Sequence, residues 1–227
     1  MKHYYEHGGI TIYNCDCLDI LPEINKCGLL LTDPPYGIGS WSATGGNSLS
    51  QAEVDEINGW DLAAGIDTLQ LCIAKADYSI VWGGNYFGIG KTRAPLIWDK
   101  ANRGMHYADG EMAWTNFDFG TLRIFNYSLA ESEVKNKRRH PTQKPINLMK
   151  WCINQAKRAT GVILDPFMGS GTTLEAAKEM GRKAVGIEIQ EKYCEIAAKR
   201  LDSCAVLPFG DENEKEELSL KIFEDFI

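Results

Sequence analysis

Apolar residues in this chain gather in short runs that alternate with longer segments of helical period. Short apolar runs that end at Gly, Pro or Asp are typical of strands buried on both faces of a parallel sheet. The pattern predicts strands near residues 10–14, 29–33, 78–82, 95–98, 161–165 and 183–188, with further strands inside 111–126. Helices are predicted at 62–75, 145–158, 172–180 and 190–201. This alternation indicates an α/β fold, with a mostly parallel sheet and helices on both faces.

Two stretches depart from the pattern of buried strands. Residues 37–59 are rich in Gly, Ser and Asn without an apolar period, which predicts a mobile loop. Polar and apolar residues alternate in 111–114 and again in 121–125. Such alternation favours strands with one exposed face, so we expect a hairpin here. An antiparallel edge of the main sheet is the alternative.

The chain has 227 residues, which suffices for one large α/β domain but not for an added restriction or helicase domain. We assign residues 1–208 to this domain and residues 209–227 to an acidic C-terminal tail. Of the formal net charge of −7, Asp211–Ile227 contributes −5, from seven acids and two lysines. The other residues together carry −2, so most of the acidic balance is one solvated charge run.

The spacing of the cysteines and histidines argues against a metal site. The seven cysteines show no paired metal-ligand spacing, and the four histidines are scattered. No apolar run has the length that crosses a membrane, and no signal peptide is evident. We therefore expect reduced thiols, no metal, no membrane partner and a cytoplasmic location.

A candidate catalytic turn follows the apolar run Leu29–Leu31. There, Asp33 is followed by Pro34, Pro35 and Tyr36. Prolines hold φ at about −65°, so the turn restricts the geometry of the carboxylate relative to the aromatic ring. Sites in open α/β sheets gather at the carboxyl ends of strands, where Asp33 is predicted to lie. Taken alone, these four residues are equally compatible with a proline turn that carries a surface or capping Asp.

A glycine-rich turn follows a later predicted strand. Gly169 and Gly171 lie between Asp165 and a predicted helix, and glycine lets a ligand approach the backbone closely. The turn has no Lys before Thr172, as a P-loop requires, and no G-x-G-x-x-G fingerprint. It therefore suits a ligand without a triphosphate. Glu188 ends the next strand, where such folds hydrogen-bond ribose hydroxyls, although a solvated strand end is the alternative.

Basic residues cluster between the predicted catalytic turn and the glycine-rich turn. Lys135, Lys137, Arg138, Arg139 and Lys144 fall within ten residues, together with His140. Such a strip is suited to binding phosphates, and a solvated loop is the alternative.

These motifs together resemble the amino-methylating DNA methyltransferases, in the permuted "beta" order that places the catalytic motif before the cofactor motif. The matching segments are Asp33-Pro34-Pro35-Tyr36, the stretch from Asp165 to Thr173, residues 13–17, residues 140–145 and Glu188. The resemblance implies a Rossmann-like, S-adenosylmethionine-dependent methyltransferase fold. Its cofactor would be S-adenosylmethionine, and the cofactor product S-adenosylhomocysteine.

The resemblance also assigns site residues one by one. The catalytic residues it implies are Asp33, Pro34, Pro35 and Tyr36. The cofactor-binding residues it implies are Asp16, Cys17, Asp33, Lys144, Asp165, Phe167, Gly169, Ser170, Gly171, Thr172, Thr173 and Glu188. Asp16 is also placed as a helix N-cap. We assign Lys135, Lys137, Arg138 and Arg139 to DNA binding, and residues 101–136 to a small target-recognition insertion.

The implied chemistry explains these residue types. The amino nitrogen of a base is a poor nucleophile, because its lone pair is delocalised into the ring. Asp33 and the carbonyl of Pro34 would accept its hydrogens, and Tyr36 would stack on the base after it leaves the duplex. The methyl group is then transferred directly between aligned atoms, without a metal or a nucleophilic cysteine.

The acid at position 33 favours adenine N6 in DNA as the target. The alternatives are cytosine N4, where the family more often begins the motif with Ser, a protein glutamine, where it usually begins with Asn, and an inactive cofactor-binding module. The expected partners are DNA, a second copy in a homodimer, and a cognate restriction enzyme. The family is common in bacteria and their viruses, so a bacterial or bacteriophage-infected cell is expected.

Overall fold

The computed structural model describes residues 2–37, 64–103, 108–128 and 143–204. Its strands are β1 (Tyr5–His7), β2 (Ile10–Asn14), β3 (Cys27–Thr32), β4 (Ala76–Trp82), β5 (Leu96–Asp99), β6 (Gly110–Thr115), β7 (Arg123–Asn126), β8 (Ile163–Asp165) and β9 (Ala184–Glu188). Its helices are α1 (Cys17–Ile20), α3 (Ile66–Ala74), α4 (Ile146–Gln155), α5 (Thr172–Glu179) and α6 (Glu191–Asp202), with a 3₁₀ turn η1 (Gly84–Tyr86). The predicted loop at 37–59 and the tail at 209–227 lie, apart from Gly37, outside the described residues.

The nine strands of the described residues form one sheet, in the order β1-β2-β9-β8-β3-β4-β6-β5-β7. Strands β2, β9, β8, β3 and β4 are parallel neighbours, as the sequence pattern predicts. Their C-terminal ends therefore meet at one edge of the sheet, which we call the carboxyl edge.

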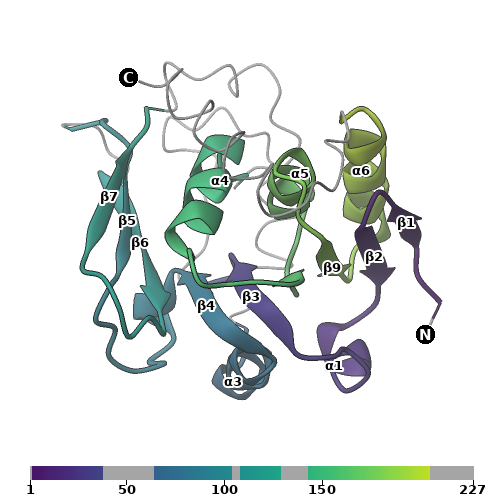
Figure 1. Ribbon diagram of the computed structural model, residues 1–227, viewed down its shortest axis with the longest axis horizontal. Helices are drawn as coiled ribbons and strands as arrows, with labels where there is room; N and C mark the ends of the chain where they lie inside the picture. Colours follow the sequence, from purple (N-terminus) through teal and green to yellow (C-terminus); the bar gives the residue numbers. More distant parts are fainter. Residues whose placement is uncertain (1, 38–63, 104–107, 129–142, 205–227) are drawn as a thin grey trace.

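Helices cover both faces of the sheet (Figure 1), with α4, α5 and α6 on one side and α1 and α3 on the other. Strand β3 is buried along its whole length, and its side chains alternate between the two faces. Leu29 and Leu31 belong to the core that contains Leu148 of α4, whereas Leu30 packs in the core that contains Cys72 of α3. A continuously apolar run is the expected sequence of such a two-sided strand.

The antiparallel part of the sheet corrects the predicted hairpin at 111–126. Strand β6 pairs with β4 and β5, and β7 pairs with β5 in parallel, so β6 and β7 are not neighbours. The intervening chain packs on the face of the sheet that α4 covers, where the rings of Phe117 and Phe119 contact Tyr78. The alternating segments therefore form strands, as predicted, but β6 and β7 each pair with β5 and not with each other. The other expectation, an antiparallel edge of the main sheet, is met only in part: β6 is antiparallel to both of its neighbours, but the edge strand is β7, which is parallel to β5.

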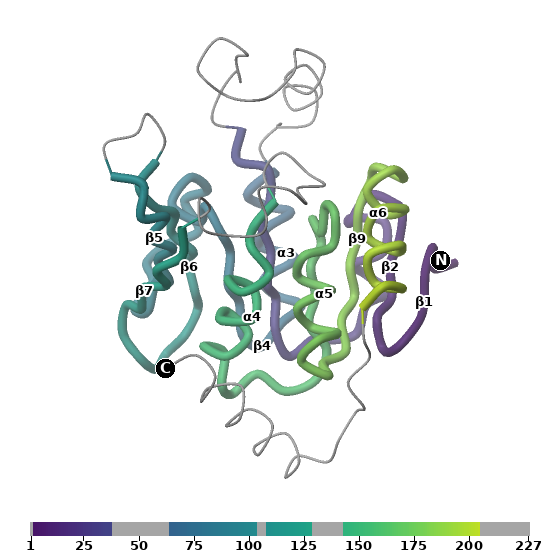
Figure 2. The backbone as a smooth tube through the Cα atoms, turned by 90° about the horizontal axis from the view of Figure 1, so that it is seen from above, coloured from purple at the N-terminus to yellow at the C-terminus, as the bar shows by residue number. Residues whose placement is uncertain are grey.

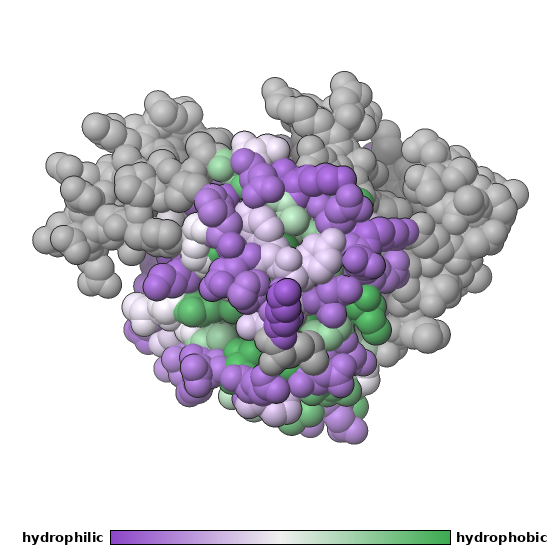
Figure 3. Space-filling view, turned by 90° about the vertical axis from the view of Figure 1, so that its right-hand side faces the viewer, coloured by the Kyte–Doolittle hydropathy of each residue, from purple (hydrophilic) through white to green (hydrophobic). Residues whose placement is uncertain are grey.

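Strands β1 and β7 form the two ends of the sheet. Figure 2 shows β1 and β7 at opposite ends. The side that carries β1 and α6 is mostly hydrophilic with small apolar patches (Figure 3), and the short β1 gives little edge for another strand to pair with. Within the part of the chain that the structure describes, no helix is both long and apolar enough to cross a membrane.

Candidate active site

The carboxyl edge brings together motifs that are far apart in the sequence. Thr32, the last residue of β3, donates a hydrogen bond from Oγ1 to Oδ1 of Asp165 at 2.8 Å. Asp33 follows Thr32, so the predicted catalytic and cofactor turns are in direct contact. Beyond β8, the backbone N–H of Gly169 donates to Oε2 of Glu188 at 3.0 Å. The predicted Asp33, Asp165, Gly169 and Glu188 thus form one continuous group.

Both carboxylate oxygens of Asp33 have partners inside the protein. The phenol of Tyr36 donates to Oδ1 at 2.5 Å, and the ammonium of Lys144 donates to Oδ2. Burial raises the pKa of Asp33, and the charge of Lys144 counteracts this effect. Pro34 is buried and Pro35 half-buried, which holds the turn against the sheet.

Lys144 pairs with two acids, Asp33 and Glu111. Its side chain is 7% exposed, and Nζ also lies 3.0 Å from Oε2 of Glu111 on β6. The rings of Tyr36 and Trp82 flank the ammonium, at 5.7 and 5.8 Å from the ring centroids. Burial lowers the pKa of Lys144, but the acids around it outweigh burial and hold the pKa well above its usual value. Lys144 is therefore an ammonium ion at neutral pH.

Glu111 is a functional candidate that the sequence did not reveal. Its Oε1 pairs with Nζ of Lys100 at 2.5 Å, so it lies between two lysines. Burial raises the pKa of Glu111, but Lys144 and Lys100 outweigh burial and lower it to about 2. A single acid in an alternating strand gives no sequence signal, because its role depends on β6 lying next to β4.

Tyr86 is a second candidate that sequence reasoning missed. It lies on η1, directly after β4, and its ring stacks on Tyr36 with centroids 5.3 Å apart and a 29° tilt. Phe87 contacts the same ring edge-on at 6.0 Å. Gly83 has φ of 66°, and a Cβ there would lie 2.2 Å from the Tyr36 ring, so glycine makes room for the aromatic group. Two glycines and two aromatics right after a predicted strand were the available signal.

The glycine turn has the backbone geometry that its sequence predicts. Gly169 and Gly171 have φ of 51° and 80°, and Gly171 caps α5. A Cβ on Gly171 would lie 2.8 Å from Cβ of Ala197 on α6, so the two helices approach closely there. Ser170 and Thr172 are buried; the Oγ of Ser170 contacts Oε1 of Gln143 at 3.4 Å.

The buried Asp165 has an unusual environment for a carboxyl group. It is 3% exposed, and it accepts hydrogen bonds from Thr32, Thr173 and the backbone N–H of Phe167. Burial raises its pKa to about 6, because these neutral donors compensate only part of the lost hydration. Asp33 adds a smaller repulsion that acts in the same direction.

Glu188 and Asp16 end neighbouring strands of the carboxyl edge. Glu188 accepts backbone hydrogen bonds from Gly169 and, at 2.8 Å, from Gln190, and burial raises its pKa. The exposed Asp16 accepts from the N–H of Leu18 at 2.9 Å, so it caps α1 as one interpretation of the sequence predicts. The neighbouring Cys17 is buried, and it accepts a hydrogen bond from the thiol of Cys72, which lowers the pKa of Cys17.

Some predicted residues lie outside the described part of the chain. These are Lys135, Lys137, Arg138 and Arg139, together with residues 140–142 of the matching motif. The described chain resumes at Gln143, directly before Lys144.

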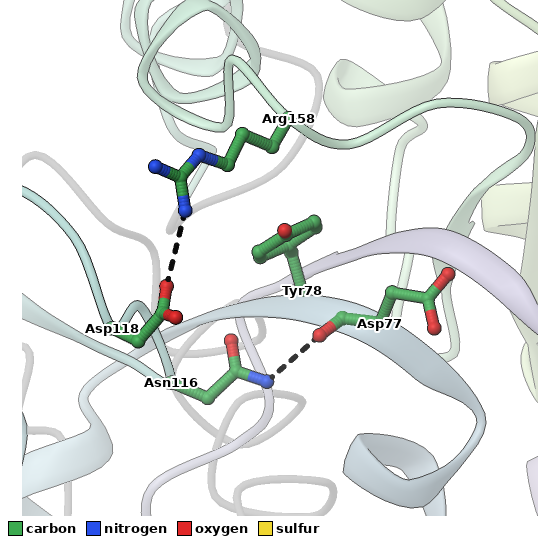
Figure 4. A pocket seen from close by; sticks show the side chains of 5 residues that line it. All are labelled: Asp77, Tyr78, Asn116, Asp118 and Arg158. Carbon is green, nitrogen blue, oxygen red and sulfur yellow. Dashed lines mark hydrogen bonds and ion pairs between the residues drawn. The ribbon is translucent and has the colours of Figure 1, made fainter.

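Other polar clusters lie away from the carboxyl edge. The hollow in Figure 4 is at the start of β4, where Arg158 pairs with Asp118 at 3.6 Å and Asn116 donates to the carbonyl of Asp77 at 3.1 Å. A separate group of possible metal ligands comprises Glu175, Glu179 and Cys204. Arg200 pairs with the first of these and Lys150 with the second, so cationic side chains already balance both acids.

Comparison with known proteins gives consistent matches. A family model described as DNA methylase matches residues 66–199. The Type II methyltransferase M.HinfI of Haemophilus influenzae is 30% identical over 93% of this chain and 72% of its own length. The Type II methyltransferase M2.LlaDCHI of Lactococcus lactis subsp. cremoris is 26% identical over 90% of this chain and 93% of its own length.

Two solved structures share the fold. The M1.HpyAVI–SAM complex superimposes with a TM-score of 0.56 at 20% identity, covering 85% of this chain and 99% of that one. The PvuII DNA methyltransferase, described as cytosine-N4-specific, gives a TM-score of 0.56 at 16% identity, covering 95% and 93%.

Proposed function

Because the chain belongs to the DNA methylase family and is an S-adenosylmethionine-dependent DNA amino-methyltransferase, we propose that it methylates the N6 amino group of adenine at a specific site. The enzyme class and the Rossmann-like methyltransferase fold predicted from the sequence are confirmed by the family match, the relatives and the structural neighbours. The observation that carries the choice of adenine is the first residue of the catalytic turn. It is Asp33, whereas the cytosine-N4 members of the family more often have Ser there.

The polar groups of the carboxyl edge fit a cationic nucleoside cofactor. Asp165 and Glu188 accept hydrogen bonds from neutral donors, so they offer negative charge to a positively charged ligand. In this proposal Glu188 holds the ribose hydroxyls, and Asp16 the adenine amino group. The turn from Gly169 to Gly171 lets the methionine part approach the backbone. When bound, the cofactor supplies a methyl group on a positively charged sulfur.

The catalytic turn would act on the amino group of the target base. Asp33 and the carbonyl of Pro34 accept the two amino hydrogens, which draws the nitrogen lone pair out of the ring and toward the methyl group. Formation of the N–C bond would break the S–C bond of the cofactor, so the leaving group would be a neutral thioether. The methylated nitrogen then releases one proton to the Asp33 carboxylate, which passes it to water. Holding the reacting atoms in line supplies most of the rate enhancement.

The aromatic pair Tyr36–Tyr86 is the proposed platform for the flipped base. Tyr86 is 54% exposed beside the half-buried Tyr36, so the pair presents an aromatic surface next to Asp33. A base that leaves the duplex loses its stacking partners, and an aromatic side chain replaces them.

DNA phosphates would be bound by the basic strip. The support for this proposal is in the sequence, where Lys135, Lys137, Arg138 and Arg139 precede Lys144 by fewer than ten residues. Residues 101–136 are the proposed target-recognition insertion of the domain at 1–208. A homodimer, and a restriction enzyme acting on the same site, stay predictions; relatives named Type II methyltransferases support the second.

Labelled methyl transfer tests the proposal. The purified protein is incubated with methyl-labelled S-adenosylmethionine and unmethylated genomic DNA, and the DNA is digested to nucleosides for mass spectrometry. Labelled N6-methyladenine is the expected product. Labelled N4-methylcytosine would keep the mechanism and refute the choice of base. Absence of label, from a protein that binds the cofactor, would instead favour an inactive module.

A further inference from the structure

In the proposed reaction the substrate must compete for Asp33 with two residues of the protein itself. The amino group needs an oxygen of Asp33, yet Tyr36 and Lys144 donate to both oxygens. The Lys144 ammonium also opposes the chemistry, because positive charge develops on the amino nitrogen while the methyl group is transferred. A cation bonded to Asp33 cancels the negative charge that should stabilise that nitrogen.

Glu111 offers the ammonium a second position. Its Oε2 is 3.0 Å from Nζ of Lys144, and among the described residues this oxygen accepts no hydrogen bond of good geometry. It is therefore a buried acceptor with unused capacity, which normally carries a free-energy cost. Because Nζ already contacts both acids, a change of side-chain torsion in Lys144 suffices to exchange one for the other.

We propose that Glu111 is a positioning residue that takes over the Lys144 ammonium when the target base binds, and so frees Oδ2 of Asp33 for the amino group. The inference rests on the proposed methyl transfer and deepens it. It assigns to β6, outside the recognised motifs, a role in preparing the catalytic carboxylate.

The surroundings of Glu111 suit this exchange. Lys100 pairs with Oε1, so the acid stays ionised and in place while Lys144 moves. The rings of Trp82 and Tyr36 flank the Lys144 ammonium on its way between the acids. The site holds two lysines and two acids, so the exchange moves charge without adding any.

The matched substitution is Glu111→Gln, which keeps the shape and removes the charge. Lys144 then stays on Asp33, and the amino group must displace it without compensation. The single-turnover rate of methyl transfer, at saturating cofactor and DNA, should fall by about ten- to a hundredfold, as for loss of a charged hydrogen bond. The affinities for cofactor and DNA should change little. Glu111→Asp, which keeps the charge, should recover part of the rate.

A second set of variants, made in a Lys144→Met chain, distinguishes the proposed role of Glu111 from a purely structural one. If Glu111 acts only by drawing Lys144 away, Glu111→Gln should cost nothing further in a Lys144→Met chain. That double variant removes one positive and one negative charge, so it also guards against a failure of the single variant to fold. Glu195→Gln is the control, because it makes the same change of charge in an exposed ion pair with Lys199 on α6.

The possible outcomes distinguish failure of the role of Glu111 from failure of the proposed function. Equal rates for the wild-type chain and Glu111→Gln would overturn the inference alone, and so would an equal loss of rate in the Lys144→Met background. A wild-type chain that transfers no methyl group to DNA would refute the proposed function, and the inference with it. Loss of rate in Glu195→Gln to the same extent would show a general effect of charge, which also contradicts the role of Glu111.

Discussion

Asp33 is the residue on which the proposed chemistry depends most directly. Replacing it with Asn keeps the shape of the turn and removes the negative charge beside the amino group. Methyl transfer should fall by about a hundredfold or more, the scale of losing one preorganised electrostatic contact. Cofactor affinity, measured by calorimetry, should stay nearly intact, because Lys144 retains Glu111 as a partner. Comparable loss of cofactor binding would place Asp33 in the cofactor site instead.

Tyr86 tests the aromatic platform at the same scale. Tyr86→Ala should weaken binding of target DNA by about five- to a hundredfold, since stacking of a base on an aromatic ring contributes about 1–3 kcal/mol. Tyr86→Phe keeps the ring and is the matched control. A fluorescent adenine analogue at the target position reports on base extrusion. Equal extrusion by the Ala variant and the wild type would mean that Tyr86 is only an exposed side chain.

Asp165 predicts a pH dependence of stability. Its pKa of about 6 exceeds the ordinary value of 3.8, so the folded protein keeps a proton that the unfolded chain has lost. The contribution of this group to the free energy of unfolding is therefore present at low pH and is lost as the pH rises from about 4 to 6. The loss is on the order of 2–3 kcal/mol.

The substitution Asp165→Asn removes this cost above pH 6. In urea unfolding, the variant should gain stability relative to the wild type at pH 8, and the gain should shrink at pH 5. It should bind the cationic cofactor more weakly at pH 8, where the wild-type carboxylate is ionised. A variant that is less stable than the wild type at pH 8 would show that the hydrogen-bond network needs the charge.

Between elements, the tightest packing constraint near the site is the approach of α6 to the start of α5. Gly171→Ala should lower the free energy of unfolding by roughly 1–2 kcal/mol, because alanine is strained at the positive φ of this position. It should lose about 1–3 kcal/mol more for the overlap with Ala197. Gly120→Ala is the control, since Gly120 has φ of 79° and a Cβ added there would have no atom within 4 Å. Urea unfolding of both variants should show the larger loss of unfolding free energy for Gly171→Ala. Equal losses would mean that α6 shifts to make room for the added methyl group.

The same scale shows what the sequence could and could not determine. Runs such as Leu29–Leu31 identify parallel strands, because both faces are buried and the period is local. The place of β5 between β6 and β7 is not local, since it depends on which edges remain unpaired after the parallel centre has formed. The pairing of Lys144 with Glu111 could not be predicted for the same reason, because Glu111 lies on β6. The carboxyl-edge residues Asp33, Asp165 and Glu188 were predictable because each directly ends a recognisable strand.

For the molecule as a whole, the acidic and basic charge runs belong to different segments of the sequence. Strand β9 ends at the carboxyl edge, so α6 runs back and ends at Asp202 on the opposite side. The acidic stretch Asp211–Ile227 follows in the sequence, whereas the basic strip directly precedes Lys144. A protein with net charge −7 can bind DNA if its positive charges are concentrated where the phosphates lie.

This arrangement predicts how salt should affect DNA binding. Neutralising Arg138 and Arg139 with Gln should weaken binding uniformly across sequences. It should also reduce the slope of log affinity against log salt by about 2, since each lost phosphate contact contributes about 0.9. Lys157→Gln with Arg158→Gln makes the same change in net charge at the opposite edge, where Arg158 pairs with Asp118, and should leave the slope unchanged. Equal changes in slope from the two pairs would mean that DNA senses only the net charge, and that the strip is a solvated loop.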